Sequence, residues 1–272
     1  MSLQSAPLVY LFLETSTLAA QRHLYEEMLD LPLIEIEPHL PHHRHGVVKY
    51  DAGGVVLSLN LTGSSRFRRT SSDAITTVFA ATPGSASVVE RLRDAPQLGT
   101  VRSEDGATLF TDRNGHHYRF LDAPSDVVGR LAPAVVRFQL SVVDLPSSVE
   151  FYALRLGLTL LDADDRRAAF ATGSVELELE QRPDAVDGRE PRTATSLIVF
   201  HTHDLEATTE SLTTRGVEFR SQHAGYSEIG GTIRFDDPSG HRLCLYQPSD
   251  ESLTWGSGPK VSEIAAGRAL AK

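Results

Sequence analysis

An internal repeat constrains the fold of this chain more than any other feature of the sequence. Phe151-Tyr152 aligns with Leu24-Tyr25 at an offset of 127 residues. Towards the end of each half an Asp-x-x-Gly-His sequence recurs, at residues 237–241 and 112–116, with an offset of 125 residues. A period of almost half of the 272 residues indicates that the chain consists of two similar halves.

Each half divides again into two units with the same order of elements. Residues 135–143 and 196–200 have the apolar, β-branched pattern of strands, and each is followed by Asp-Leu and a predicted helix. In the first half, residues 75–80 form a predicted strand and residues 85–92 a predicted helix. The sequence therefore predicts four units, each with a strand, a helix and further strands, and an α+β fold.

The composition between these units predicts the domain boundaries. We expect an N-terminal domain over residues 1–124, a linker rich in Pro, Ala, Asp and Gly over 125–133, a C-terminal domain over 134–248 and a tail over 249–272. Within the tail, residues 261–270 are predicted to form a short helix that packs on the body of the protein.

Charge and cysteine content exclude several classes of protein. The chain has 26 basic and 36 acidic residues, and a net charge of −10 argues against nucleic-acid binding. A single cysteine, Cys244, excludes a disulfide framework. We find neither a run of about 20 apolar residues nor a secretory signal, so we expect no membrane partner and a cytoplasmic location.

The second half carries motifs that point to a family. Asp144-Leu145 precedes Phe151-Tyr152, then Leu156-Gly157-Leu158 follows, and Asp237-Pro238-Ser239-Gly240 precedes the closing strand. This pattern resembles the vicinal oxygen chelate superfamily. That superfamily includes glyoxalase I, the bleomycin-resistance proteins, the fosfomycin-resistance enzymes and the extradiol ring-cleavage dioxygenases. The resemblance covers about residues 8–122 and 134–248, nearly the whole chain.

The resemblance implies a specific architecture. The family's unit is a βαβββ module, and two modules curve their sheets into an open cup that holds a ligand or a metal. We therefore predict four modules paired into two glyoxalase/bleomycin-resistance-like domains, with cup-shaped mixed sheets. The first half is the more divergent, because Asp30 and Leu24 stand where the family usually has glycine and phenylalanine.

In the metal-using relatives, the resemblance implies one ligand on the first strand of a module, usually His, and one on the last strand, usually Glu. We expect the equivalent residues of each half to line one cup and to contact the ligand. Only Glu178 among them is a suitable ligand for a hard metal, so neither cup is predicted to carry the family's metal set. The residues are Arg137, Glu178, Leu197 and Cys244 in the second half, and Tyr10, Ser58, Thr77 and Arg119 in the first.

Other histidines offer a fallback metal site. His39, His42, His43 and His45 cluster in the loop over residues 37–46, where they could bind Fe, Mn, Ni or Zn if that loop folds over a cup. His201 lies on the predicted strand face of Leu197, and we expect it at the protein surface near the strand end.

Arg137 and Glu178 are the best candidates for chemistry. A buried guanidinium or carboxylate is costly without a partner, so the two side chains should pair with each other or with a ligand. If the two side chains contact a ligand instead, Arg137 could stabilise an oxyanion and Glu178 could move a proton. Cys244 is interpreted as a small buried apolar residue and not as a nucleophile.

The sequence leaves two functions open. The first is a protein that binds a small organic molecule in a cup, without the family's metal set, either to sequester it or to convert it as a metal-free lyase or isomerase. The alternative is a divalent-metal-dependent enzyme, similar to glyoxalase or the extradiol dioxygenases, with a non-standard ligand set. The expected partner is a small-molecule ligand or substrate, and the sequence leaves a homodimer open.

Overall fold

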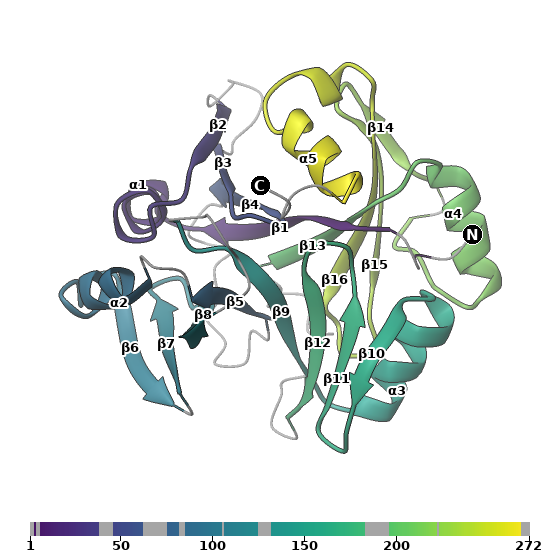
Figure 1. Cartoon of the computed structure of the whole chain (residues 1–272). Helices are drawn as coiled ribbons and strands as arrows, with labels where there is room; N and C mark the ends of the chain where they lie inside the picture. The colour runs from purple at the N-terminus through teal and green to yellow at the C-terminus, as the bar shows by residue number, and fades with distance from the viewer. Residues whose placement is uncertain are drawn as a thin grey trace.

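The protein, described here as a computed structural model, contains two eight-stranded mixed sheets (Figure 1). The structure describes residues 3, 6–37, 46–61, 75–81, 85–104, 106–124, 132–182, 196–221 and 223–267. We call the sheet with strand order β14-β15-β16-β13-β1-β4-β3-β2 sheet A. Its strands are β1 (Leu8–Thr15), β2 (Leu33–Glu37), β3 (Val47–Asp51), β4 (Val56–Leu61), β13 (Ser196–His201), β14 (Gly225–Ser227), β15 (Gly230–Asp236) and β16 (Arg242–Pro248).

Sheet B has the strand order β10-β11-β12-β9-β5-β8-β7-β6. Its strands are β5 (Ile75–Ala81), β6 (Gly99–Glu104), β7 (Ala107–Asp112), β8 (His117–Pro124), β9 (Val135–Val142), β10 (Thr159–Ala163), β11 (Arg167–Ala171) and β12 (Glu176–Gln181). The helices are α1 (Leu18–Arg22), η2 (His23–Met28), α2 (Ser85–Arg93), α3 (Leu145–Glu150), η4 (Phe151–Arg155), α4 (Leu205–Thr214), η5 (Ser252–Thr254) and α5 (Gly258–Ala265).

The four predicted modules and the α+β fold class are confirmed, but each sheet takes one module from each half of the chain. Sheet A joins residues 8–61 to residues 196–248 through the antiparallel pair β1–β13. Sheet B joins residues 75–124 to residues 135–181 through the antiparallel pair β5–β9. The predicted domain boundaries stay a prediction. The expectation that the modules of one half share a cup is wrong, because the strands pair across the halves.

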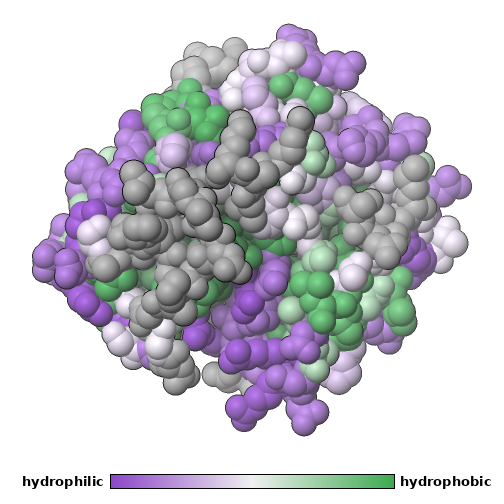
Figure 2. All heavy atoms as spheres, in the orientation of Figure 1, coloured by the Kyte–Doolittle hydropathy of each residue, from purple (hydrophilic) through white to green (hydrophobic). Residues whose placement is uncertain are grey.

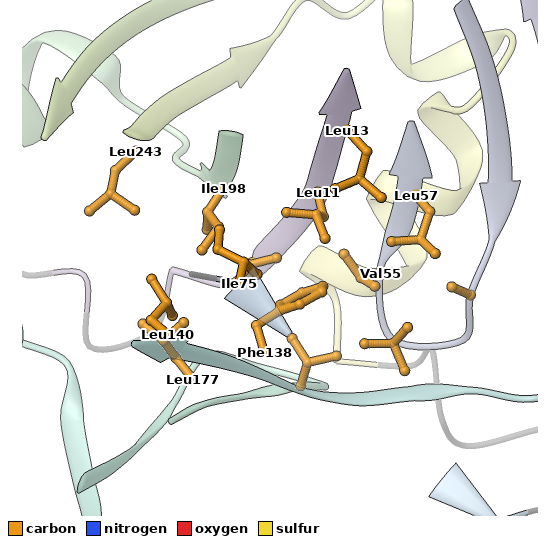
Figure 3. Close-up of a cluster of buried hydrophobic side chains, with 14 of the residues drawn as sticks. Leu11, Leu13, Val55, Leu57, Ile75, Phe138, Leu140, Leu177, Ile198 and Leu243 are labelled. Atoms are coloured by element: carbon orange, nitrogen blue, oxygen red, sulfur yellow. The ribbon is translucent and has the colours of Figure 1, made fainter. Parts of the chain in front are cut away.

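The two sheets pack back to back around one apolar core. Figure 3 shows Leu11, Leu57 and Ile198 of sheet A near Phe138 and Leu140 of sheet B. All five side chains are fully buried. Because residues alternate between the two faces of a strand, the opposite faces of the sheets point away from this core. We call these outer faces cup A and cup B.

Local interactions explain why the repeated motifs recur. Asp144 and Asp204 cap α3 and α4, since their carboxylates accept hydrogen bonds from Ser147 N at 3.1 Å and Ala207 N at 2.9 Å. After η4 the chain turns at Gly157 with φ 74°, and Asp30 adopts φ 52° at the equivalent position. A left-handed conformation is costly for most residues but less so for aspartate, so the first half keeps the turn without glycine.

The C-terminal segment also follows the prediction in part. A helix does form there, as α5, and it lies over sheet A between β2–β3 on one side and β14 on the other (Figure 1). No helix in the described part of the chain is long and apolar enough to cross a membrane.

Candidate small-molecule binding site

The floor of cup A consists of apolar and aromatic side chains from the four central strands of sheet A. Tyr10 and Phe12 on β1 are in register with Val199 and Leu197 on β13. Tyr246 on β16 completes an aromatic group, because its ring centroid lies 6.1 Å from that of Tyr10, which in turn lies 5.3 Å from that of Phe12. These residues belong to a small hydrophobic cluster, separate from the core between the sheets.

The C-terminal segment covers part of this floor. Tyr10 Oη and Ser257 Oγ are 2.8 Å apart, and Ser257 N donates to Glu35 Oε2 at 3.1 Å. Val261 and Ile264 on α5 are each 1% exposed and pack in the same cluster as Tyr10. The segment after β16 is therefore an integral wall of cup A.

Between the floor and this segment lies a cavity of about 300 Å³. That volume is at the lower end of the range of ~300–1,000 Å³ for small-molecule sites. Apolar and polar side chains from β1, β2, β3, β4, β13, β15 and β16 and from the C-terminal segment contribute to its walls. The lining residues include Tyr10, Phe12, Glu35, Lys49, Leu197, Val199, Thr232, Arg234, Cys244, Tyr246, Trp255 and Ser257.

Two cationic side chains line the cavity, and they differ in whether an anionic partner balances their charge. Lys49 Nζ forms a salt bridge with Glu35 Oε2 at 3.1 Å, and the two side chains are only 13% and 11% exposed. Arg234 is exposed and forms no salt bridge with any residue that the structure describes. The fixed charge of Lys49 is thus balanced by Glu35, whereas that of Arg234 is not.

The hydroxyl and thiol groups in the cavity keep their protons at neutral pH. Burial raises the pKa of Tyr10 to about 12, and it also raises the pKa of Tyr246. Burial raises the pKa of the Cys244 thiol to about 11, against the opposing effect of the nearby Arg234 guanidinium. Cys244 is 2% exposed, so it is buried as predicted and is not poised as a thiolate nucleophile.

Cup B has a different chemistry. Arg137 donates from Nη1 to Glu178 Oε2 at 2.7 Å and from Nε and Nη2 to Glu176 Oε2 at 3.0 and 2.8 Å. Gln139 Nε2 donates to the other oxygen of Glu178 at 3.0 Å. The sequence left two alternatives for Arg137 and Glu178, and in the structure these two side chains form a salt bridge with each other. In Figure 2, hydrophilic residues gather in the lower middle of the molecule, where Figure 1 places β9, β11 and β12.

The structure regroups the eight sequence-predicted residues. Tyr10, Leu197 and Cys244 line the cavity, and Ser58 lies on the same sheet, where its hydroxyl donates to Asn60 Oδ1 at 3.2 Å. Arg137, Glu178 and Arg119 lie on sheet B, on the opposite side of the molecule. Whether any of the eight contacts a ligand stays a prediction.

Thr77 was expected on a cup face, but it lies on the back of sheet B. It is in register with Tyr118 on β8 and with Phe138 on β9, and both of these belong to the core between the sheets. Residues in register on neighbouring strands point to the same face, so Thr77 points to the core. Its neighbour Val78, in register with Arg119 and Arg137, takes the cup position.

Several cavity residues were missed by sequence reasoning. Lys49 and Arg234 lie on β3 and β15, the middle strands of their modules, whereas the expected ligand positions are on first and last strands. Trp255 lies in the predicted tail, before the helix expected over residues 261–270. The alternation along β15, with Ile233 and Phe235 buried and Arg234 exposed, was the one usable signal for Arg234.

The described residues do not fit the metal set that the resemblance implies. No group of three or more His, Cys, Asp or Glu side chains could hold a metal within those residues. His201 was expected at the surface but is 4% exposed, with burial lowering its pKa to about 4. His39, His42, His43 and His45 lie outside the described residues, so the fallback site stays a prediction.

Comparisons with known proteins agree with this architecture. Residues 134–245 match the family model of the Glyoxalase/Bleomycin resistance protein/Dioxygenase superfamily. The match lies in the second half of the chain and covers less than half of it, and the whole chain shares its overall fold with two solved structures. No curated protein sequence matches the chain.

Two solved structures cover nearly the whole chain. Glyoxalase I from Zea mays has a TM-score of 0.70 and 15% identity, over 89% of this chain and 92% of that one. A candidate dioxygenase from Bacillus subtilis subsp. subtilis str. 168 has a TM-score of 0.66 and 12% identity, over 96% of each chain. At these identities the likeness concerns the fold alone.

Proposed function

We propose that the protein binds a small organic molecule in the cavity of cup A without a bound metal, either to hold it or to convert it as a metal-free enzyme. The observation that carries this proposal is the cavity of about 300 Å³ with an aromatic floor and a few placed polar groups. Such a combination is typical of small-molecule sites. Members of the superfamily bind small molecules, which supports the proposal at the level of the family.

The predicted catalytic roles of Arg137 and Glu178 stay separate from this site. Both lie on sheet B, and the donors of Arg137 are engaged with Glu176 and Glu178. The proposal therefore assigns binding to cup A and leaves any chemistry at Arg137 and Glu178 as a prediction. Product analysis of each bound compound separates a protein that holds its ligand from one that converts it.

The chain offers an intrinsic probe for this test. Trp255 is its only tryptophan and lines the cavity. We would titrate the protein with small alcohols, amides and carboxylates of cyclohexane, which do not absorb near 295 nm, and record Trp255 emission. At least one compound should change the emission and saturate.

A matched pair of variants locates the binding. Thr232→Phe fills the cavity from β15 and should abolish the response. Thr159→Phe makes the same change on an exposed residue of β10, in sheet B, and should leave the response unchanged. A response that persists in Thr232→Phe, or no response to any compound, would contradict the proposal.

The metal-free part of the proposal needs its own measurement. We would determine Fe, Mn, Ni and Zn by elemental analysis in untagged protein purified without chelator, before and after adding each metal and dialysing. We expect no stoichiometric metal. Metal that survives dialysis in a one-to-one ratio would favour the alternative, an enzyme with a non-standard ligand set.

A further inference from the structure

We propose that the cavity of cup A selects small aromatic molecules with a single negative charge, and that Arg234 binds the anionic group. This inference rests on the proposed function, because it names the class of molecule that the same cavity accepts.

The charge balance of the walls favours an anion. Among the described lining residues, Glu35, Lys49 and Arg234 are the groups charged at neutral pH. Glu35 and Lys49 neutralise each other in their salt bridge. The cavity is left with one net positive charge, although the chain as a whole carries −10. One negative group on the ligand would balance this charge.

The protonation states add no competing anion. The raised pKa values of Tyr10 and Cys244, about 12 and 11, keep both groups neutral at pH 7. The hydroxyl of Tyr246 donates a hydrogen bond to Ile229 O at 2.8 Å, and burial raises its pKa as well. The unbalanced guanidinium of Arg234 therefore meets no anion from these walls.

A second arginine, Arg242, lies near Arg234 on the same face of sheet A. Arg234 is in register with Cys244 on the cavity floor, and Asp236, two residues on, is in register with Arg242. Arg234 and Arg242 are thus diagonal neighbours on one face of the sheet. The Nε of Arg242 is buried without a hydrogen-bond partner in the described structure, and burial together with Arg220 and Arg234 lowers its pKa against the opposing effect of Glu14 and Asp236. Asp236 does not offset these charges fully, because it forms a salt bridge with Arg220 at 2.6 Å.

The ring arrangement favours an aromatic body. Tyr10, Phe12, Tyr246 and Trp255 all line the cavity. The Tyr10 ring packs edge to face against Tyr246 and is tilted by 33° from the ring of Phe12. The aromatic rings of the cavity therefore present both faces and edges to a ligand, at several angles. A flat aromatic ring gains offset-stacked and edge-to-face contacts in such a setting. The body of the ligand then lies on the floor and its anionic group at the exposed Arg234.

Isothermal titration calorimetry with two matched probes tests this inference. 2-Naphthoate carries the charge, and 2-naphthamide is its neutral counterpart of nearly the same shape. We expect 2-naphthoate to bind about five- to tenfold more tightly, the size of one partly solvated charge-assisted contact. Arg234→Gln should remove this preference, whereas Arg234→Lys should keep most of it. Arg113→Gln, at an exposed site in the turn between β7 and β8, should leave it unchanged.

The outcomes separate the inference from the proposed function. If both probes bind wild-type protein equally and Thr232→Phe blocks both, selection for an anion is wrong and cup A is still a binding site. If 2-naphthoate is preferred but Arg234→Gln keeps the preference, the role of Arg234 is wrong. If neither probe binds, the inference is overturned, and the Trp255 titration decides the proposed function independently.

Discussion

Cup A and cup B are each built from two modules of the same type, but their concave faces carry different side chains. At one position on the β1–β4 pair of sheet A stand Phe12 and Ser58, in register with each other. The equivalent β9–β12 pair of sheet B has Gln139 and Glu178. In cup B charged side chains neutralise one another across the strands, whereas in cup A a separate C-terminal segment covers an apolar floor.

This difference has a physical cause. A carboxylate on a sheet face needs a cation or donors, and Arg137 and Gln139 supply both to Glu178. Contact between apolar side chains and water is unfavourable, so a segment that covers the apolar floor of cup A stabilises the fold. Because that cover fits only part of the floor, a cavity remains. One concave sheet of this protein thus carries paired charged side chains, whereas the C-terminal segment partly covers the other above a cavity of about 300 Å³.

The strongest test of the comparison removes the cover. A chain that ends after Pro248 lacks α5 and exposes the surfaces buried by Val261 and Ile264. At ~1.5–3 kcal/mol for each buried aliphatic side chain, we expect a loss of about 3–6 kcal/mol in the free energy of unfolding. Urea denaturation measures it. A chain that ends after Gly267 keeps α5 and should match the full-length protein. Equal stability of the shorter chain would mean that α5 does not support cup A.

Breaking the charge network of cup B should cost less. Arg137→Met leaves Glu178, whose side chain is 8% exposed, without its cation, and we expect a loss of about 1–3 kcal/mol. Adding Glu178→Gln should recover part of this loss, because the buried charge disappears. The comparable surface pair gives the control: Arg155→Met should cost under ~1 kcal/mol. Neither change should alter binding in cup A, and a large effect there would show that the cups are coupled.

A smaller effect is expected at the contact between floor and cover. Tyr10→Phe removes the hydroxyl that lies 2.8 Å from Ser257 Oγ, and the expected loss is about 0.5–1.5 kcal/mol. Tyr226→Phe is a matched control, because that hydroxyl is exposed and lies 3.4 Å from Glu206. Thermal or chemical unfolding of both variants measures the difference. An equal response of the two tyrosines would contradict the role given to Tyr10.

The last effect concerns pH. Burial, together with His203, lowers the pKa of His201 from 6.5 to about 4, so folding favours the neutral ring. The stability that depends on this neutral ring is present above pH 6.5 and is lost as the pH falls towards 4. Wild-type protein should therefore lose more stability over this range than His201→Gln. His223→Gln, at an exposed position, should follow wild type; parallel curves for all three proteins would exclude His201 as a cause.

Much of the fold could be read from particular residues. Residues 135–143 and 196–200 have local strand patterns and form β9 and β13, and the Asp-Leu pairs that follow them begin the predicted helices α3 and α4. The candidate site was less accessible. Lys49 and Arg234 were missed because nothing in the local pattern says which solvent-facing residue of a middle strand meets a cavity. Thr77 was misplaced because one residue of register reverses the face of a strand.

The sequence by itself determined the four-module architecture, the pairing of Arg137 with a nearby carboxylate as one of two alternatives, and the burial of Cys244. These follow from local periodicity, turn chemistry and the cost of unpaired charge. Only the tertiary structure decided which modules share a sheet, and hence that Tyr10, Leu197 and Cys244 line one cavity while Arg137 and Glu178 lie on the other sheet. Strand pairing between distant segments depends on the packing of the whole core, and that information is not contained in any single segment.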